Sequence, residues 1–413
     1  MSRSRRRARP AGRTGARARP RDGVSSGLDV LAAARFEPLR GLAVGLVCNP
    51  AAVDRHLRHA ADLLHGGGVR LASLFGPEHG ARGDAQYMAA VEEERDRRTG
   101  APVHSLYGRG AASLRPAPEH LRGLDALVFD LQDVGSRWYT FQATMLLCME
   151  AAAAAGVSLV VLDRPNPLGG LLVEGPALRP GFESFCGMHD VAVRHGMTVG
   201  ELAGLYRAER RIDVELTVIR CRGWRRGMPA AETGLPWVMP SPNMPTPETA
   251  LVYPGACLLE GTNLSEGRGT TRPFELAGAP WLDADRLAAA LEAERLPGVR
   301  FRSASFVPAW DKHAGTRCHG VQIHVADASA FRPFRTGVAL AAAARAQDPG
   351  RFRWRAESYE FVEGVPAFDL LCGSARERQA LERGEGWRSL APAWAREERA
   401  FARRRRPYLL YEA

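Results

Sequence analysis

An alternation of continuous apolar runs with helical segments is the feature of this 413-residue chain that most narrows its fold. Apolar runs that favour strands lie at 42–50, 69–75, 102–108, 125–133 and 157–165, and several of them are separated by segments of helical character. Strands that are apolar throughout, and not only at every second position, are typical of parallel sheets buried on both faces. The sequence therefore predicts an α/β fold in which helices cover both faces of a parallel sheet.

A proline-rich segment at 236–255 divides the chain, because closely spaced prolines favour a stiff, extended connection. The part that follows alternates again between helical and apolar segments. We expect helices near 283–295, 331–346 and 375–403, and strands near 299–307, 319–326 and 357–362. The predicted organisation is a tail at 1–25, one α/β domain at 26–240 and a second α/β domain at 241–413.

The basic charge of the chain belongs to its N-terminal tail. The formal net charge is +10, but residues 1–21 contain nine Arg and no acidic residue, which leaves about +1 for the rest. An arginine-rich tail is able to contact nucleic acid or anionic lipid, and it is also what a disordered extension or a misassigned start codon produces. We favour a disordered tail and expect no nucleic-acid partner.

The sequence shows neither a membrane-spanning segment nor a secretory signal, and this decides the cellular location that we expect. No run approaches the roughly 18 apolar residues of a membrane span, and no apolar segment of a secretory signal follows the charged N-terminus. The seven Cys have no CxxC spacing, and several lie in apolar runs, which favours reduced core residues. We predict a cytoplasmic protein, with export only if the start site is misassigned. The oligomeric state is not indicated.

Polar side chains follow each of the five apolar runs. Because ligands bind beyond the carboxyl ends of parallel strands, these side chains predict a site along one rim of the sheet. Glu78 is the strongest candidate, since it follows Pro77 at a strand end and lies between Gly76 and Gly80, which let a ligand approach the backbone. The other candidates at the strand ends are Asn49, His79, Asp130, Asp133, Arg137, Tyr139, Asp163, Arg164 and Asn166.

Several of these candidates also have a purely structural interpretation. Asp130 and Asp163 fit caps of helices or turns, and Arg137 fits an ion pair with Asp133. His79 fits a hydrogen-bonded turn. For Glu78, use in the site is the favoured interpretation.

A second polar segment, at 258–275, carries Glu260, Asn263, Glu266 and Arg268 among glycines. Acids, an amide and an Arg on a flexible backbone suit a hydroxylated, amide-bearing or carboxylated ligand. The alternative interpretation is a long surface loop.

Other chemistries have little support in the sequence. Walker, GxGxxG and HExxH patterns are absent and no GxSxG elbow at a strand-to-helix turn is indicated, so we expect neither a cofactor nor a metal. Two carboxylates with separated pKa values are the usual equipment for glycoside hydrolysis. A carboxylate-rich rim also fits an isomerase, a lyase or a metal-assisted hydrolase.

The order of several long motifs resembles one family of glycosidases. These motifs are FGPEHGARG (75–83), DLQDVGSRWYT (130–140), LDRPNPLGG (162–170), PSPNMPTPETALVYPG (240–255) and CLLEGTNLSEGRGTTRPFE (257–275). Over about 26–413 the chain resembles the NamZ-type exo-β-N-acetylmuramidases, glycoside hydrolase family 171. The resemblance implies a Rossmann-like catalytic domain, a smaller C-terminal α/β domain that closes the active-site cleft, and release of N-acetylmuramic acid from the non-reducing end of peptidoglycan fragments.

The resemblance also implies roles for individual residues. The family's catalytic glutamate matches Glu78, which we expect to act as general acid. Asp130 or Asp163, or with less support Glu266, would activate water or stabilise positive charge on the sugar. Arg268 or Arg164 would bind the lactyl carboxylate, and Asn263 and Asn166 the acetamido group and hydroxyls. The residues expected to bind substrate are Asn49, His79, Asp133, Arg137, Tyr139, Arg164, Asn166, Glu260, Asn263, Glu266 and Arg268.

Two alternatives stay open at this point. A non-catalytic muropeptide-binding protein can share the fold, because fold does not determine function. A hydrolase of another amino sugar would use similar groups.

Overall fold

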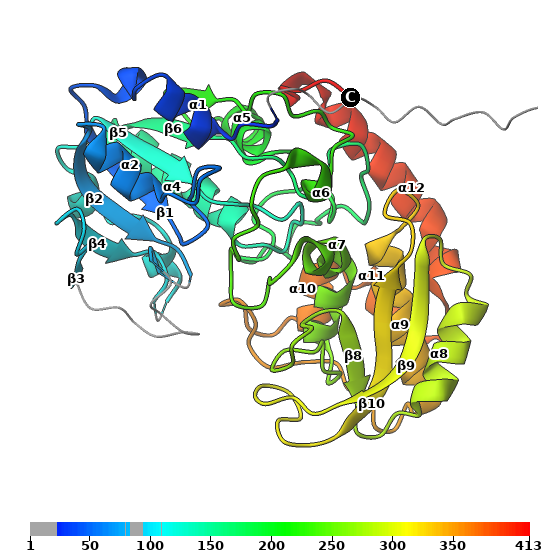
Figure 1. The fold of residues 1–413 in the computed structure, drawn as a ribbon. Coiled ribbons are helices and arrows are strands. Elements are labelled where there is room, and N and C mark those ends of the chain that lie inside the picture. The colour runs from blue at the N-terminus through cyan, green and yellow to red at the C-terminus, as the bar shows by residue number, and fades with distance from the viewer. Residues whose placement is uncertain (1–22, 79, 83–93, 109) are drawn as a thin grey trace, which may run out of the picture.

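A computed structural model describes residues 23–78, 80–82, 94–108 and 110–413 of the chain. Its larger sheet has seven strands in the order β3-β4-β2-β1-β5-β6-β7 (Figure 1). All neighbours pair in parallel except β3 and β4. The strands are β1 Ala43–Cys48, β2 Arg70–Gly76, β3 Glu94–Arg95, β4 Pro102–Ser105, β5 Ala126–Asp130, β6 Ser158–Leu162 and β7 Leu216–Ile219. The six parallel strands follow the Rossmann order, which reverses direction between β1 and β5.

Helices cover both faces of this sheet, as the continuous apolar strands predict. Along β1, Val44 and Leu46 belong to an apolar cluster with Leu28 and Leu64 of α1 and α2, whereas Val47 belongs to the cluster on the other face. The second cluster includes residues of α4 and α5. The helices of this part are α1 Gly27–Ala33, α2 Ala60–Gly66, α3 Pro118–Leu121, α4 Phe141–Ala155, α5 Val199–Glu209 and α6 Ala230–Thr233, with short 3-10 helices η1 Glu37–Leu39 and η2 Ala111–Leu114.

A smaller antiparallel sheet follows in the C-terminal part, with the order β8-β10-β9. Its apolar residues continue the same cluster that covers one face of the larger sheet, so the two parts share a core. The elements are α7 Pro247–Ala256, η3 Cys257–Gly261, β8 Leu276–Ala279, α8 Ala284–Ala293, β9 Val299–Phe306, β10 Cys318–Val325, α9 Pro333–Gln347, α10 Ala367–Cys372, α11 Arg376–Glu382, α12 Trp387–Arg404 and η4 Arg406–Tyr408.

Two local predictions differ from the structure. The segment 236–255 is not extended throughout, because α7 begins after Thr246, whose side chain accepts a hydrogen bond from the Thr249 backbone N–H, and Pro at its first position suits a helix start. The segment 357–362 is not a strand. Its apolar residues belong to a tight turn closed by hydrogen bonds between Tyr359 and Val362.

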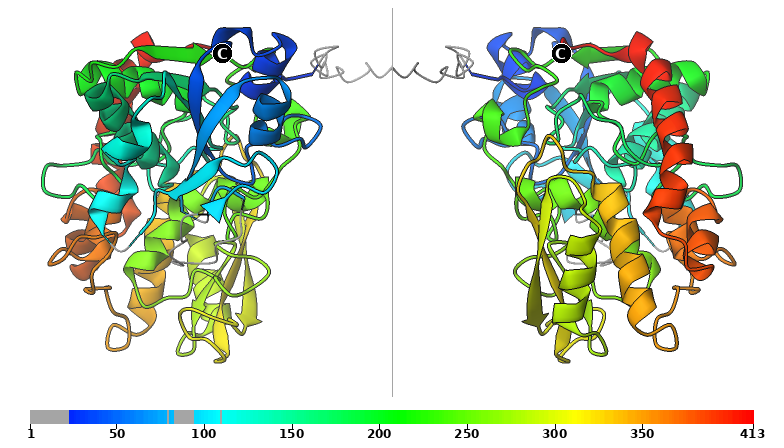
Figure 2. Two further views of the ribbon diagram at one scale, coloured as in Figure 1. Left: turned by 90° about the vertical axis from the view of Figure 1, so that its left-hand side faces the viewer. Right: turned by 90° about the vertical axis from the view of Figure 1, so that its right-hand side faces the viewer.

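The last helix runs beside both sheets and returns the chain end to the first one. Both views in Figure 2 show α12 along one side of the molecule, and Figure 1 shows the C-terminus near α5. On α12, the Glu398 carboxylate accepts a hydrogen bond from the Gly175 backbone N–H (3.1 Å). The predicted boundary at 240/241 stays a prediction, but residues after α12 contact the first part of the chain.

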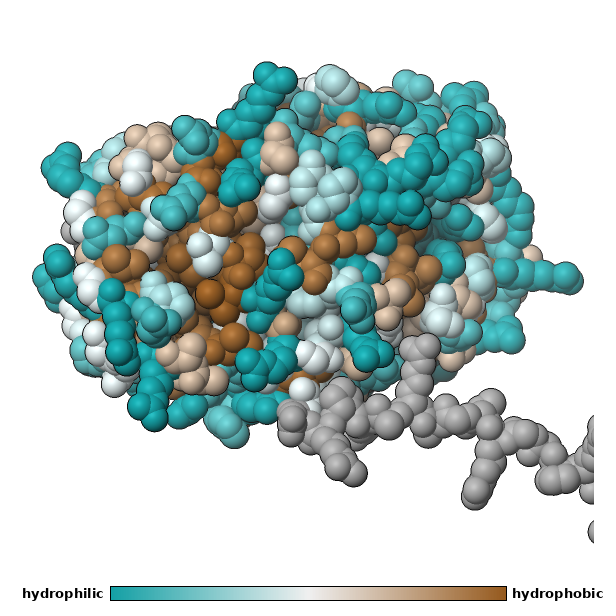
Figure 3. Space-filling model, turned by 90° about the horizontal axis from the view of Figure 1, so that it is seen from above, coloured by the Kyte–Doolittle hydropathy of each residue, from teal (hydrophilic) through white to brown (hydrophobic). Residues whose placement is uncertain are grey.

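Seen from above in Figure 3, polar residues cover much of the molecule, and apolar residues gather over the half that holds the larger sheet. No helix among the described residues is long and apolar enough to cross a membrane. All seven cysteines, each in the described part of the chain, are buried and free.

Candidate active site

A cavity of about 310 Å³ lies between the rim of the larger sheet and the C-terminal part of the chain. From the first part it receives Glu78 after β2, Tyr107 after β4, and the segment 138–141, which leads into α4. Its other walls come from 241–244, from the segment 260–274 and from 355–361. Glu78 and the glycine-containing loop, both predicted from sequence, therefore line the same cavity.

Glu78 is half-buried at the wall of this cavity. Burial raises the pKa of its carboxyl from 4.5 to about 7; the nearby Glu260 also raises it, whereas Arg268 and a hydrogen bond from Thr140 lower it. The Thr140 hydroxyl lies 3.5 Å from the Glu78 Oε2. A carboxyl with such a pKa is protonated in a large fraction of molecules at neutral pH, as a general acid requires.

The segment 258–275 brings a buried network of charges to the cavity. The Arg268 guanidinium lies between two carboxylates, at 2.7 Å from Glu260 and 3.2 Å from Glu266. Lys312 donates to Glu266 (3.0 Å) and to the backbone carbonyls of Leu259 and Leu264. Burial alone would raise the pKa of Glu260, but Arg268 and the Tyr359 hydroxyl lower it below its ordinary value. Glu260 is thus favoured as a carboxylate near Glu78, whose pKa is raised.

The cavity residues that the sequence prediction missed include Arg355, Tyr359 and Glu360. Tyr359 and Glu360 lie on the segment interpreted as a strand at 357–362, and Arg355 lies just before it, where no polar motif or glycine marked a site. The Tyr359 hydroxyl donates to the Glu260 Oε2 at 2.8 Å. Burial, together with Glu78 and Glu260, raises the pKa of Glu360 to about 8, against the opposing charges of Arg268 and Arg355. The cavity therefore contains two carboxyl groups with raised pKa values, those of Glu78 and Glu360.

The structure places Asp130, Arg164 and Asn49 outside the lining of this cavity. Arg164 binds both oxygens of Asp130, at 2.6 and 2.9 Å, and both side chains are buried. The Asn49 amide donates to the Pro240 carbonyl at 3.0 Å. The rim of the sheet where the strand order reverses, which holds the ligand in other proteins with this topology, is therefore occupied by the chain itself.

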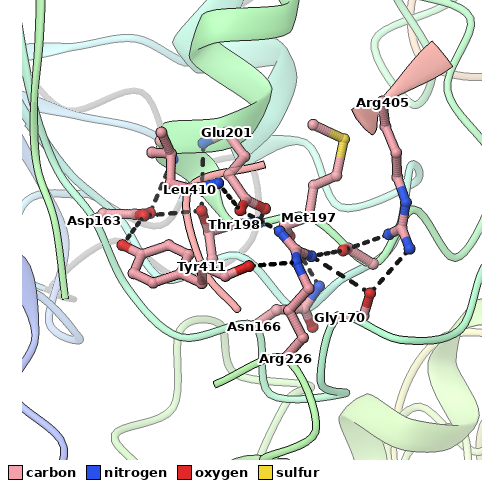
Figure 4. Close-up of polar contacts among 12 residues, drawn as sticks. Asp163, Asn166, Gly170, Met197, Thr198, Glu201, Arg226, Arg405, Leu410 and Tyr411 are labelled. Carbon is pink, nitrogen blue, oxygen red and sulfur yellow. Dashed lines mark hydrogen bonds and ion pairs between the residues drawn. The ribbon is translucent and has the colours of Figure 1, made fainter. Parts of the chain in front are cut away.

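Asp163 and Asn166 belong to a separate buried cluster that holds the C-terminal segment, as Figure 4 shows. Asp163 accepts hydrogen bonds from the Thr198 hydroxyl (2.8 Å), the Gly200 backbone N–H (2.8 Å) and the Tyr411 hydroxyl. Asn166 donates to the Met197 carbonyl (2.9 Å). Burial raises the pKa of Asp163 to about 6 although these hydrogen bonds oppose the shift. Its oxygens are thus engaged in structure and do not line the cavity.

The remaining candidates divide between cavity and scaffold. Tyr139 lines the cavity. Arg137 is buried and donates to the carbonyls of Pro176, Val191, Leu371 and Cys372 at 2.8–3.2 Å, so it holds α10 against the first part of the chain and does not pair with Asp133. Asp133 and Asn263 are likewise hydrogen-bonded within the protein. Asp133 accepts from the Gly135 N–H. The Asn263 side chain donates to the Arg351 carbonyl and accepts from the Arg353 N–H. His79 lies outside the described residues.

Among the described residues, no three His, Cys, Asp or Glu side chains gather as a metal-binding group. The fold and the cavity together fit a two-domain α/β enzyme with protonatable carboxyl groups in a pocket, the equipment of a glycoside hydrolase.

The chain belongs to the exo-β-N-acetylmuramidase NamZ family. Residues 44–248 match the model of the family's N-terminal domain, and residues 251–411 match that of its C-terminal domain. It is 44% identical over 389 residues to the peptidoglycan β-N-acetylmuramidase NamZ of Bacillus subtilis (strain 168), covering 94% of this chain and 91% of that protein.

Two solved structures, both DUF1343 family proteins from Bacteroides fragilis NCTC 9343, share the fold. One has a TM-score of 0.86 at 36% identity and covers 95% of this chain and 100% of its own. The other has a TM-score of 0.75 at 28% identity and covers 94% of this chain and 99% of its own.

Proposed function

We propose that this chain is an exo-acting β-N-acetylmuramidase that releases N-acetylmuramic acid from the non-reducing end of peptidoglycan fragments, with Glu78 as general acid. The observation that carries the proposal is the position of Glu78 at the wall of the cavity in a chain that matches the family over both domains.

The charges of the cavity fit the proposed reaction. Protonated Glu78 donates its proton to the glycosidic oxygen as the bond to the leaving sugar breaks. Positive charge develops on the sugar ring as this bond breaks, and the carboxylate of Glu260, held ionised by Arg268, stabilises it. A water molecule then forms the new bond to the anomeric carbon and loses a proton to solvent. Of the three residues predicted as the second carboxylate, Glu266 lines the cavity, whereas Asp130 and Asp163 do not.

The proposed substrate is a small, soluble muropeptide or a disaccharide with N-acetylmuramic acid at its non-reducing end. We keep the cytoplasm as the expected location, where such an activity would serve recycling of imported fragments.

A panel of chromogenic glycosides tests the proposal. We expect the purified full-length protein to release the chromophore from a β-N-acetylmuramide and to act at least a hundredfold more slowly on the matching β-N-acetylglucosaminide. Faster cleavage of the glucosaminide would identify a hydrolase of another amino sugar. Tight binding of N-acetylmuramic acid without any turnover would identify a binding protein.

A further inference from the structure

The proposed substrate carries a lactyl carboxylate, which needs a positively charged partner in the cavity. Among the described residues, three cationic side chains line the cavity: Arg268, Lys312 and Arg355. Arg268 is already paired with Glu260 and Glu266, and Lys312 with Glu266 and two carbonyls. A carboxylate that bound either of them would lie close to Glu260 or Glu266, whose negative charges oppose it.

Arg355 differs from the other two cations because none of the carboxylates that the structure describes lies within ion-pairing distance of it. Its guanidinium donates only one weak hydrogen bond, to the Ser358 carbonyl at 3.3 Å, and lies 5.0 Å from the centre of the Tyr359 ring. Its backbone N–H donates to the Gly261 carbonyl at 2.9 Å, which fixes it beside the 258–275 loop. The planar fork of donors is thus positioned but still able to bind a carboxylate.

The turn that follows Arg355 is strained and reaches across the cavity. Glu360 and Phe361 both have positive φ, +48° and +66°, in a two-residue turn of the type that usually requires Asn-Gly. Strain of this kind persists where the surroundings enforce it and is concentrated at functional sites. Here the Phe361 ring packs against Tyr107 from the first part of the chain, and Tyr359 is bonded to Glu260.

The carboxyl of Glu360 could lie beside a bound carboxylate without repelling it. Its Oε2 is buried and has no hydrogen-bond partner among the described residues. The charged groups that face it are Glu78, Glu260, Arg268 and Arg355, and burial is the largest influence that keeps it neutral near pH 7. A neutral carboxyl is a hydrogen-bond donor, so it would not repel a bound carboxylate.

We propose that Arg355, carried on the segment 355–361, binds the lactyl carboxylate of the muramic acid ring, and that the buried carboxyl of Glu360, whose Oε2 has no partner among the described residues, hydrogen-bonds at the same subsite. This inference rests on the proposed function and assigns the group that distinguishes a muramide from a glucosaminide. It replaces Arg268 and Arg164, the candidates from sequence, since both are already paired with carboxylates.

Two substrates that differ only at the lactyl group test the subsite. One is the chromogenic β-N-acetylmuramide, and the other is the same glycoside with the lactyl carboxylate converted to a carboxamide. For Arg355→Ala we expect KM for the carboxylate substrate to rise at least tenfold and KM for the carboxamide to change less than twofold. Arg355→Lys should lie between wild type and Arg355→Ala, and the exposed Arg353→Ala serves as matched control with both KM values unchanged.

A binding measurement keeps this test separate from the proposed function. Calorimetry of wild type should show tighter binding of N-acetylmuramic acid than of N-acetylglucosamine, and Arg355→Ala should lose that preference while keeping the wild-type thermal unfolding midpoint. An unchanged KM for the carboxylate substrate, or an equal rise for both substrates, would overturn the inference. Absence of turnover by wild type with the binding preference intact would overturn the proposed function and leave the subsite standing.

Discussion

Replacing Glu78 by Gln should make the protein more stable at alkaline pH while it removes the general acid. The pKa of this carboxyl is near 4.5 in the unfolded chain and about 7 in the folded protein. Ionisation is therefore harder in the folded state, and the penalty appears as the pH rises above 4.5 and is complete above 7. Gln keeps the shape of the side chain and cannot ionise.

The size of the gain follows from the same two values. One pKa unit corresponds to about 1.4 kcal/mol, so the rise from 4.5 to about 7 gives an upper value on the order of 3 kcal/mol. Because the side chain is only half-buried, contact with water lowers this figure, and we expect about 2 kcal/mol at pH 8 and about zero at pH 4.

Urea unfolding followed by tryptophan fluorescence measures this difference at both pH values. The exposed Glu363→Gln is the control for the chemical change itself, and its effect should be small and the same at pH 4 and pH 8. If Glu78→Gln were no more stable than wild type at pH 8, the folded protein would not disfavour the ionised form of Glu78. The raised pKa assigned to this carboxyl would then be wrong.

Three further predictions concern the pH profile and the scaffold. The value of kcat/KM on a muramide should fall as the pH rises through about 7, because Glu78 loses its proton; a constant rate from pH 6 to 9 would contradict this. Arg164→Met should destabilise the protein by about 3–5 kcal/mol, measured by urea unfolding, because it leaves Asp130 buried and unpaired. Tyr411→Phe should cost about 1–3 kcal/mol, seen as a lower Tm, because Asp163 and the Cys221 N–H lose their shared partner; an unchanged Tm would show that this contact is dispensable.

The sheet could be predicted from sequence because its signal is local. Strands such as β1 and β5 are apolar on both faces, and this pattern requires helices on both sides whatever the rest of the chain does. The polar residues at the strand ends were a weaker guide. The sequence does not distinguish three acids that follow strands: Asp130, Asp163 and Glu78. Which of them can reach a ligand depends on how other segments of the chain pack over this rim of the sheet.

The rest of the site depends on contacts between distant parts of the chain. Asn49 donates a hydrogen bond to the Pro240 carbonyl, 191 residues away in sequence. Asp163 accepts a hydrogen bond from Tyr411, 248 residues away. Glu360 enters the cavity through a turn without glycine or asparagine, so its sequence indicates neither a turn nor a site. Site residues such as Glu360 are therefore recognised only when the residues that line the cavity are known from the structure.

The most direct test of Glu78 as the proton donor is the turnover of a chromogenic β-N-acetylmuramide by wild type and by Glu78→Gln at pH 6, with folding of both verified by circular dichroism. Removal of a general acid typically lowers the rate by about 10²–10⁴-fold, and we expect a loss of kcat in that range. A variant that keeps kcat within a few-fold of wild type would contradict the assignment of the acid and with it the proposed mechanism.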